Sequence, residues 1–338
     1  MARATIDDVA ALAGVSMKTV SRVVNKEPNV RATTREKVES AIAELDYRPS
    51  QSARSLAANR SYVLGLLYDN PSASYVIDVQ SGALASCRRL GYDLLIHPCS
   101  HESASIIEEV LSLVRQNRVD GLILTPPLSD MVELVHQLVE AKVPVVRLSP
   151  TEDKKICPYV QTNDQQAAYE MTCRLLDLGH TRIGFIAGHP DHKAVVQRFL
   201  GYKQALDDRA IALDPALVEQ GYNSFDSGSE CAERLLALAD APTAIFAGND
   251  DMAAGAIIAA HHRGISMPAE LSIAGFDDTP VAHQIYPSLT TVRQPISDMS
   301  ERAVELLQRS IDGKPKGAEA SMDCCILERE STGKAPSV

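Results

Sequence analysis

Five small polar residues stand directly after hydrophobic runs of the sequence and are suited to binding hydroxyl groups. They are Asp69, Ser149, Asn249, Asp250 and Asp277. Their carboxylate, amide and hydroxyl groups can make the paired hydrogen bonds by which proteins hold sugars. In an open sheet of parallel strands, ligands bind outside the carboxyl ends of the strands. Each residue taken alone is more typical of a helix N-cap or a turn, so position by itself leaves both interpretations open.

The sequence lacks the motifs of common enzyme classes. It contains no GxGxxG opening a helix, no GxxxxGK[ST], no HExxH and no GxSxG. We therefore predict no catalytic residue and no cofactor. His97, Cys99 and His101 occupy alternate positions, which is compatible with a metal site in an extended segment, but we predict no metal. We expect the adjacent Cys324 and Cys325 to pack on opposite faces of a strand.

Charge is distributed unevenly along the 338 residues. The first 60 residues hold ten Lys/Arg against seven Asp/Glu, whereas the whole chain has a formal net charge of −11. A basic segment on an acidic chain is typical of a protein that meets nucleic acid through that segment alone. The start does not resemble a signal peptide and no apolar run could span a membrane. Together with seven unevenly spaced cysteines, these features favour a cytoplasmic protein with reduced thiols.

Residues 5–45 are predicted to form three short helices. Thr5 with Asp8 can cap the first helix, Gly14 can end it, and Ser16 can begin the second. Thr33 and Glu36 form a potential capping box for the third. The apolar residues at helical spacing are Ile6, Val9, Ala10 and Ala13, then Val20, Val23 and Val24, then Val38, Ala41, Ile42 and Leu45.

Two short helices joined by a glycine-containing turn indicate a helix-turn-helix. The second helix would present Met17 and Lys18 to base edges in the major groove, with Arg22 one turn later. Lys18 and Arg22 are suited to guanine or to phosphate. A plain three-helix bundle with a solvated charged face has the same spacing.

From residue 62 onward, apolar runs rich in β-formers alternate with amphipathic segments such as 103–117 and 164–178. The runs are 63–69, 92–98, 120–126, 143–149, 182–188, 242–250, 271–278 and 322–331. Nearly continuous hydrophobic runs fit strands buried on both faces. The alternation predicts parallel sheets covered by helices, and about ten strands favour two lobes.

Six stretches of the sequence resemble the LacI/GalR family of repressors. They are TIDDVAALAGVSMKTVSRVVN (5–25), RATTREKVESAIAELDYRPSQSARSLA (31–57), LGHTRIGFIAGHPD (178–191), FAGNDDMAAGAI (246–257), LSIAGFDDTP (271–280) and LTTVRQP (289–295). The resemblance implies an α/β protein with a helix-turn-helix head (1–48), a hinge helix or linker (49–61) and a two-lobed body (62–338). The body would resemble type I periplasmic binding proteins, with chain crossings near 161–164, 292–295 and 320–323.

The resemblance also implies how DNA is bound. The hinge helix would pair with that of a second subunit and insert Leu56 into the minor groove, with Ala53 beside it and Arg54 near phosphate. The DNA-binding residues that we expect are Thr5, Ser16, Met17, Lys18, Ser21, Arg22, Asn25, Asn29, Ala53, Arg54 and Leu56.

The effector would bind between the lobes. By resemblance its contacts are Asp69, Tyr75, Ser149, Arg198, Asn223, Phe225, Asn249, Asp277 and Gln294. Arg198 would grip sugar hydroxyls, Asp277 would accept from them, and Asn249 would do both. The family often has an aromatic residue near Asn223. In this chain the segment reads GYNSFDSG, so Tyr222 or Phe225 would substitute for that residue, or Tyr75 would supply the ring.

We therefore expect a transcriptional regulator, a repressor of carbohydrate-utilisation genes. It would bind a pseudopalindromic operator in double-stranded DNA as a homodimer. A sugar between the lobes would separate the hinges and release the DNA. The alternatives are a nucleobase or nucleoside effector, a soluble carbohydrate-binding protein without a DNA function, and an enzyme on an α/β scaffold.

Overall fold

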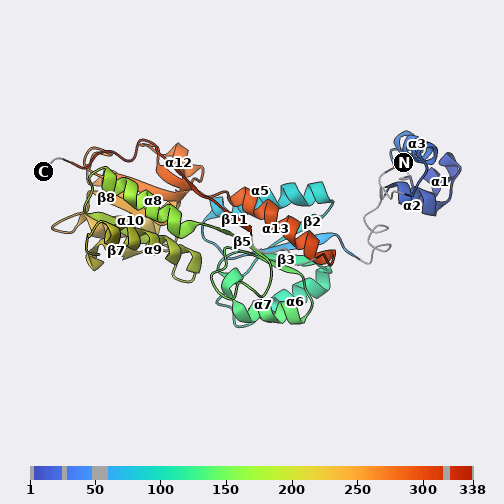
Figure 1. The fold of residues 1–338 in the computed structure, drawn as a ribbon, viewed down its shortest axis with the longest axis horizontal. Coiled ribbons are helices and arrows are strands. Elements are labelled where there is room, and N and C mark those ends of the chain that lie inside the picture. The colour runs from blue at the N-terminus through green and yellow to red at the C-terminus, as the bar shows by residue number, and fades with distance from the viewer. Residues whose placement is uncertain (1–3, 25–28, 48–59, 315–319, 337–338) are drawn as a thin grey trace. The chain divides into compact units, whose positions relative to one another are not determined.

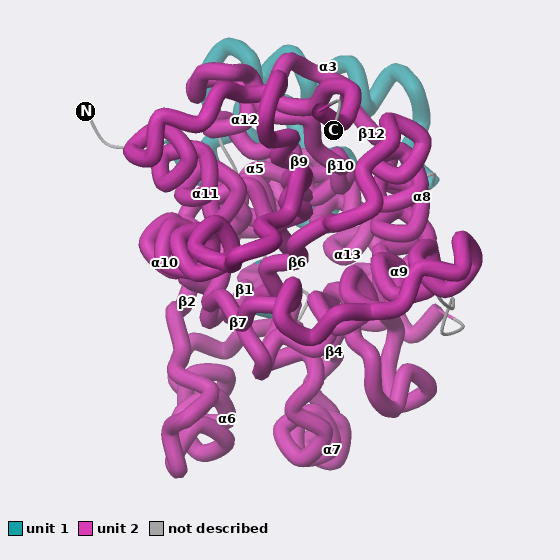
Figure 2. Tube along the Cα trace, turned by 90° about the vertical axis from the view of Figure 1, so that its left-hand side faces the viewer, with its two compact units in different colours: residues 1–62 teal, residues 63–338 magenta. Residues whose placement is uncertain are grey.

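The computed structural model describes residues 4–24, 29–47, 60–314 and 320–336. The chain divides into two compact units, residues 1–62 and residues 63–338, which are coloured separately in Figure 2. Among the described helices, none is both long enough and apolar enough to cross a membrane.

The first unit contains three helices, α1 (Ile6–Ala13), α2 (Met17–Val24) and α3 (Ala32–Glu44). Their apolar stripes meet in one small core around Val9, Val20 and Val38. The prediction of three helices with one buried stripe each is therefore confirmed.

The ends of these helices are confirmed in part. The Thr5 hydroxyl accepts from the backbone of Asp8, and the Asp8 carboxylate accepts from the backbone of Thr5. Gly14 ends α1 in the left-handed conformation (φ 64°) that glycine adopts without strain. The predicted capping box of Thr33 and Glu36 is wrong. Helix α3 begins two residues earlier than that box requires, after Arg31, without a side-chain cap.

The first lobe of the second unit is built on a six-stranded, all-parallel sheet in the order β11-β5-β4-β3-β1-β2. Its strands are β1 (Val63–Tyr68), β2 (Asp93–Pro98), β3 (Gly121–Leu124), β4 (Val145–Leu148), β5 (Tyr159–Thr162) and β11 (Ala320–Met322). Helices α5 (Ala73–Leu90) and α13 (Ile296–Ile311) cover one face of the sheet. Helices α6 (Ile106–Asn117) and α7 (Val132–Glu140) cover the other, with the short helix η1 (Leu128–Asp130) before α7 (Figure 1).

The second lobe has a second six-stranded sheet in the order β12-β10-β9-β8-β6-β7, in which only the β10–β12 pair is antiparallel. Its strands are β6 (Ile183–Ala187), β7 (Val218–Gln220), β8 (Ala244–Ala247), β9 (Ser272–Asp277), β10 (Thr290–Arg293) and β12 (Cys325–Leu327). Helices α8 (Asp164–Asp177) and α9 (Lys193–Asp208) pack on one face. Helices α10 (Phe225–Leu236) and α11 (Asp250–His262) pack on the other, and η2 (Pro215–Leu217) and α12 (Val281–Gln284) are short.

The chain passes between the lobes three times, at the expected places. It crosses from β5 to α8, from β10 to α13, and from β11 to β12. The predicted α/β fold with two parallel-sheet lobes and a helical head is thus confirmed. The hinge helix expected within 49–61 falls almost wholly outside the described residues.

One predicted strand is wrong. The run 322–331 is not a single strand, because its beginning completes β11 in the first sheet and its middle forms β12 in the second. Cys324 lies in the crossing between them and packs against the core of the second lobe, while Cys325 is exposed. The three short strands β5, β7 and β10 were absent from the predicted runs.

Gly228 allows α10 and α11 to pack closely together. A Cβ atom at this position would lie 2.2 Å from the backbone oxygen of Met252 and 2.3 Å from its Cα. Since backbone atoms cannot yield as a side chain can, we expect Gly228→Ala to lower the free energy of unfolding by about 1–3 kcal/mol. Urea denaturation would measure this. The exposed neighbour Glu230 supplies the control, since Glu230→Ala should change stability by less than about 0.5 kcal/mol. Equal effects would contradict the packing argument.

His180 is a buried histidine that is satisfied without a charge. Its Nε2–H donates to the Gly333 carbonyl oxygen (3.1 Å), and its Nδ1 lies 2.9 Å from the Thr243 hydroxyl. Burial lowers the pKa of His180, although the bond to Gly333 acts to raise it. Below the unfolded pKa of about 6.5, His180 binds a proton in the unfolded chain but not in the folded chain. The free energy of unfolding therefore falls as the pH drops below that value.

We expect His180→Gln to flatten the dependence of stability on pH between pH 7 and 5. The slope removed is at most about 1.4 kcal/mol per pH unit, the value for one proton. Urea denaturation at pH 7 and at pH 5 would measure it. His262→Gln, at an exposed position of α11, should leave the slope unchanged. An unchanged slope in the His180 variant would show that protonation of His180 does not contribute to the pH dependence of stability.

Candidate functional site

A small cavity lies between the lobes, beside the carboxyl ends of strands from both sheets. We call it the inner pocket, and its volume is about 40 Å³. The first lobe contributes Asn70, Ser72, Tyr75, Pro126 and Ser149, and the second lobe contributes Asp164, His192, Ala194, Val195, Arg198, Asn223, Asn249 and Asp277, with Gln294 at a crossing. Expected effector residues from distant parts of the chain are thus brought together here.

Arg198 lies at the centre of this pocket with its guanidinium buried. It projects from α9, and its Nε donates to Asp164 (3.1 Å) while its Nη1 lies 3.4 Å from Asp277. Nη1 also donates to the backbone oxygen of Gly248, and the guanidinium stacks 3.8 Å from the centre of the Phe276 ring. Burial alone would lower the pKa of Arg198, but the two carboxylates outweigh burial and raise it.

Asp277 is the main acceptor of the pocket. Its Oδ1 accepts from the Gln294 side chain at 2.6 Å. Burial raises the pKa of Asp277 to about 6, although Arg198 and Gln294 both act to lower it. The carboxyl of Asp164 is tied to the crossing by the hydroxyl of Thr162. A strongly held cation with two carboxylates and an amide can exchange hydrogen bonds with several hydroxyl groups of one ligand.

Asn249 and Asn223 form the opposite wall. Asn249 caps α11 by accepting from the backbone of Met252 (2.9 Å), and its amide donates to the backbone oxygen of Asn223 (3.1 Å). The Asn223 side chain accepts from the backbone of His189 (3.1 Å). The helix-cap interpretation of Asn249 and its position in the pocket are therefore both correct.

Two rings reach the pocket, Tyr75 from α5 and His192 from the start of α9. Burial, with the charge of Asp277 nearby, raises the pKa of Tyr75, so its hydroxyl stays protonated and can donate. Burial lowers the pKa of His192 to about 4, so this imidazole is neutral at physiological pH. Ser149 completes the first-lobe side at the end of β4.

Two of the expected effector residues lie elsewhere. The Asp69 carboxylate is engaged by His101, whose Nδ1 lies 2.5 Å away. Phe225 is exposed at the first position of α10 and does not line the inner pocket. Sequence reasoning missed seven of the lining residues, of which four are polar: Asn70, Ser72, Asp164 and His192. Asp164 had a usable signal, because it is the last residue of the crossing expected near 161–164.

Three polar contacts join the lobes across the cleft. The Ser72 hydroxyl donates to Asp251 (2.7 Å), Lys193 pairs with Glu152 (2.5 Å), and His101 contacts Asp191 (3.1 Å). In each pair, one residue belongs to the first lobe and the other to the second. These contacts are made in the lobe arrangement in which the inner pocket is small.

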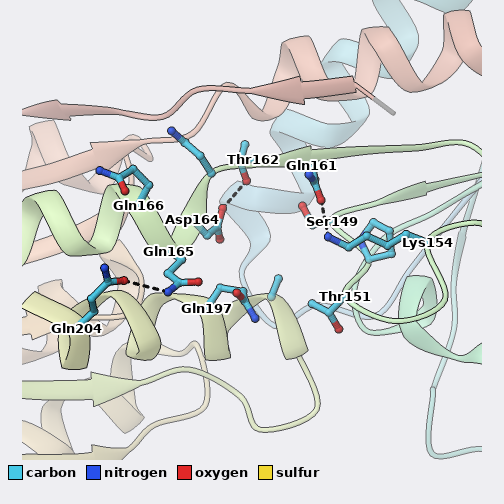
Figure 3. Close-up of a pocket in the computed structure, with 13 residues that line it drawn as sticks. Ser149, Thr151, Lys154, Gln161, Thr162, Asp164, Gln165, Gln166, Gln197 and Gln204 are labelled. Carbon is cyan, nitrogen blue, oxygen red and sulfur yellow. Dashed lines mark hydrogen bonds between the residues drawn. The ribbon is translucent and has the colours of Figure 1, made fainter. Parts of the chain in front are cut away.

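A wider groove adjoins the inner pocket and shares Ser149, Asp164 and Ala194 with it. We call it the outer groove, and its volume is about 400 Å³. Its polar side chains come from both lobes, and Figure 3 shows Lys154 bonded to Gln161 (2.6 Å) and Gln165 bonded to Gln204 (3.2 Å).

In the first unit, α2 has one buried and one exposed face. Val20 and Val23 are buried, while Met17, Lys18 and Arg22 are exposed. Asn29 is exposed and Ser21 is half-buried. The hydroxyls of Thr5 and Ser16 are used near helix starts, since they accept from the backbones of Asp8 and Thr19. The expected DNA contacts Asn25, Ala53, Arg54 and Leu56 lie outside the described residues.

A two-lobed α/β body with a polar pocket at the lobe junction, joined to a helix-turn-helix unit, defines a DNA-binding regulator controlled by a small-molecule effector. Residues 5–50 match the model of "Bacterial regulatory proteins, lacI family", and residues 172–332 match that of "Periplasmic binding protein-like domain". The chain belongs to the LacI family. Like its relatives, it is a transcriptional regulator and not an enzyme.

The similarity extends over nearly the whole chain. The HTH-type transcriptional repressor PurR of Vibrio atlanticus is 34% identical over 92% of this chain and 93% of its own length. The solved complex of the transcriptional regulator CelR with cellobiose has a TM-score of 0.74 at 30% identity, covering 97% of this chain and all of its own. The lac repressor dimer, solved with operator and the anti-inducer ONPF, has a TM-score of 0.81 at 27% identity, covering 98% of this chain and all of its own.

Proposed function

We propose that this regulator is a repressor of carbohydrate-utilisation genes whose effector is a small sugar or sugar derivative held in the inner pocket. The observation that carries the proposal is the Arg198 centre. Its buried guanidinium, carboxylates and amides match the alternating donors and acceptors of sugar hydroxyls. The related CelR was solved with cellobiose.

A nucleobase is the alternative effector. A flat base is bound by stacking between aromatic faces as well as by hydrogen bonds. Among the described residues that line the inner pocket, the aromatic rings are Tyr75 and His192, and most of the other side chains are polar. This balance favours a sugar.

The effector would act by changing how the lobes are arranged. A pocket for a drug-sized ligand measures about 300–1,000 Å³, whereas the inner pocket measures about 40 Å³. Entry therefore requires the Arg198 contacts to exchange and the lobes to shift. A ligand that prefers the shifted arrangement changes DNA affinity by that preference.

For DNA, we propose that α2 enters the major groove with Met17, Lys18 and Arg22 facing the duplex. A homodimer would place two such helices on a pseudopalindromic operator, with the residues 49–61 as the hinge between a head of 1–48 and a body of 62–338. The site of action would be the bacterial cytoplasm.

Isothermal titration calorimetry of the full chain tests the effector class. The probes are D-glucose, D-ribose and cellobiose, with hypoxanthine and guanine as the nucleobase arm. We expect saturable binding of a sugar and none of the bases. Saturable binding of a base without any sugar binding would overturn the proposal in favour of the alternative.

A further inference from the structure

His101 lies between two carboxylates that belong to different lobes. Its Nδ1 lies 2.5 Å from Asp69 Oδ2, and its backbone N–H donates to the same oxygen at 2.8 Å. Its Nε2 lies 3.1 Å from Asp191 Oδ2 in the second lobe. A neutral imidazole has one N–H, and Asp69 holds it on Nδ1. At Nε2, either the second proton of a charged imidazolium or a bound cation must then lie between the ring nitrogen and the Asp191 oxygen.

Glu102 is a third potential metal ligand close to His101 and Asp191. The ligand atoms of His101, Glu102 and Asp191 all lie within 4.8 Å of one another. Zinc binds nitrogen and oxygen at about 2.0–2.1 Å with tetrahedral angles, so two of its ligand atoms stand about 3.4 Å apart. The 3.1 Å between His101 Nε2 and Asp191 Oδ2 needs only a few tenths of an ångström of adjustment.

The local charge also favours a cation. Glu102 and Asp191 place two carboxylates near His101 Nε2, and Asp69 places a third behind the ring. Within the described part of the chain, no lysine or arginine forms an ion pair with any of the three, and the nearest other basic side chain is His189, whose Nδ1 lies 3.8 Å from Asp191. The side chains of His101 and Asp191 are 20% and 52% exposed, so an ion can enter from solvent.

We propose that His101, Glu102 and Asp191 form a binding site for a divalent metal ion of the zinc class that joins the two lobes. Asp69 is the outer carboxylate that orients the His101 ring, as carboxylates commonly do behind metal-bound histidines. The fourth position is left to water.

Because the ligands come from both lobes, the ion binds the arrangement seen in this structure more tightly than one in which the lobes separate. It therefore stabilises that arrangement by mass action. By linkage, whatever moves the lobes changes the affinity for the ion, and the ion changes that ligand's affinity by the same factor. The site does not depend on which effector occupies the inner pocket.

A second group of donors must be kept separate. His97, Cys99 and Glu109 also lie within 4.8 Å of one another, but all three belong to the first lobe. The structure thus divides the alternating residues of 97–101 between two groups. Experiments on the inter-lobe site are best done in a Cys99→Ser background, which removes the thiolate of the other group.

The test is calorimetric titration of the full chain in that background with ZnCl2, after treatment with EDTA and desalting. We expect one zinc ion per chain. His101→Ala and Asp191→Asn should each weaken binding at least tenfold, and Asp69→Asn should weaken it about 10–100-fold through loss of the outer carboxylate. His136→Ala, at an exposed position of α7, is the control and should leave the affinity unchanged. Circular dichroism confirms that each variant is folded.

Absence of zinc binding would overturn the proposal and leave a protonated His101 as the bridge. Binding that responds to His101→Ala but not to Asp191→Asn would overturn the inter-lobe assignment. As a second readout, Co²⁺ should give visible absorption in the Cys99→Ser chain that disappears in the double variant His101→Ala/Asp191→Asn. Absorption that persists in the double variant would place the ion elsewhere.

Discussion

Arg198→Ala is expected to lower the free energy of unfolding by about 3–5 kcal/mol, the cost of leaving a buried charge without its partner. Asp164 and Asp277 are both buried, and Arg198 is the cation that contacts them. Equilibrium unfolding in urea measures the decrease. The matched control is Arg209→Ala at the end of the same helix. Arg209 pairs with Asp177 in solvent (2.6 Å, side chains 45% and 53% exposed), so its removal should cost at most about 1 kcal/mol.

The same substitution should remove effector binding. Hydrogen bonds to a charged group contribute about 1.5–3 kcal/mol each, so loss of two such bonds lowers affinity on the order of 10²-fold or more. Calorimetry of the folded variant with whichever probe binds the natural chain would measure this. Arg198→Lys keeps the charge without the planar fork and should recover stability better than affinity. Unchanged affinity in Arg198→Ala would remove this residue from the site.

The double variant Lys18→Ala/Arg22→Ala is expected to weaken operator binding by at least 30-fold, because each base or phosphate contact contributes about 1–3 kcal/mol. Both side chains lie on the exposed face of α2, opposite Val20 and Val23. The operator would first be selected from random duplexes, and affinity measured by fluorescence anisotropy at fixed salt.

A side chain that binds phosphate also contributes to the salt dependence of DNA binding. The slope of log affinity against log salt should therefore become shallower by about one for each phosphate-binding side chain that the substitutions remove. Lys37→Ala, at an exposed position of α3, is the control in the same unit. Equal binding by the double variant and the control would exclude α2 as the element that contacts DNA.

Local sequence patterns predicted much of this fold because they depend on contacts between residues that are close in sequence. The Thr5–Asp8 box and Gly14 end a helix through contacts within a few residues, and the stripe of Val9 and Ala10 is buried as its spacing requires. Continuous apolar runs predicted the central strands of both sheets for the same reason. Residues 322–331 were misjudged because hydrophobicity does not reveal to which of two sheets a strand belongs. The predicted capping box of Thr33 and Glu36 was wrong because α3 already begins at Ala32, before Thr33.

The candidate site was predicted where the resemblance supplied residues at strand ends, such as Asn249, Asp277 and Gln294. It was incomplete where the position depends on how the lobes meet. His192 and Ser72 line the inner pocket because the starts of α9 and α5, which belong to different lobes, both border it, and no sequence spacing encodes that. Asp69 follows a strand as expected, but its carboxylate is bound by the backbone N–H and the ring of His101.

The central claim is that occupancy of the cleft controls DNA affinity, and one comparison tests it most directly. The dissociation constant of the selected operator is measured with the full chain alone and again with a calorimetrically proven sugar at saturation, at the same salt. The account predicts a change of at least about fivefold, the lower range for coupling between sites. Identical dissociation constants, with the sugar shown to be bound, would contradict it.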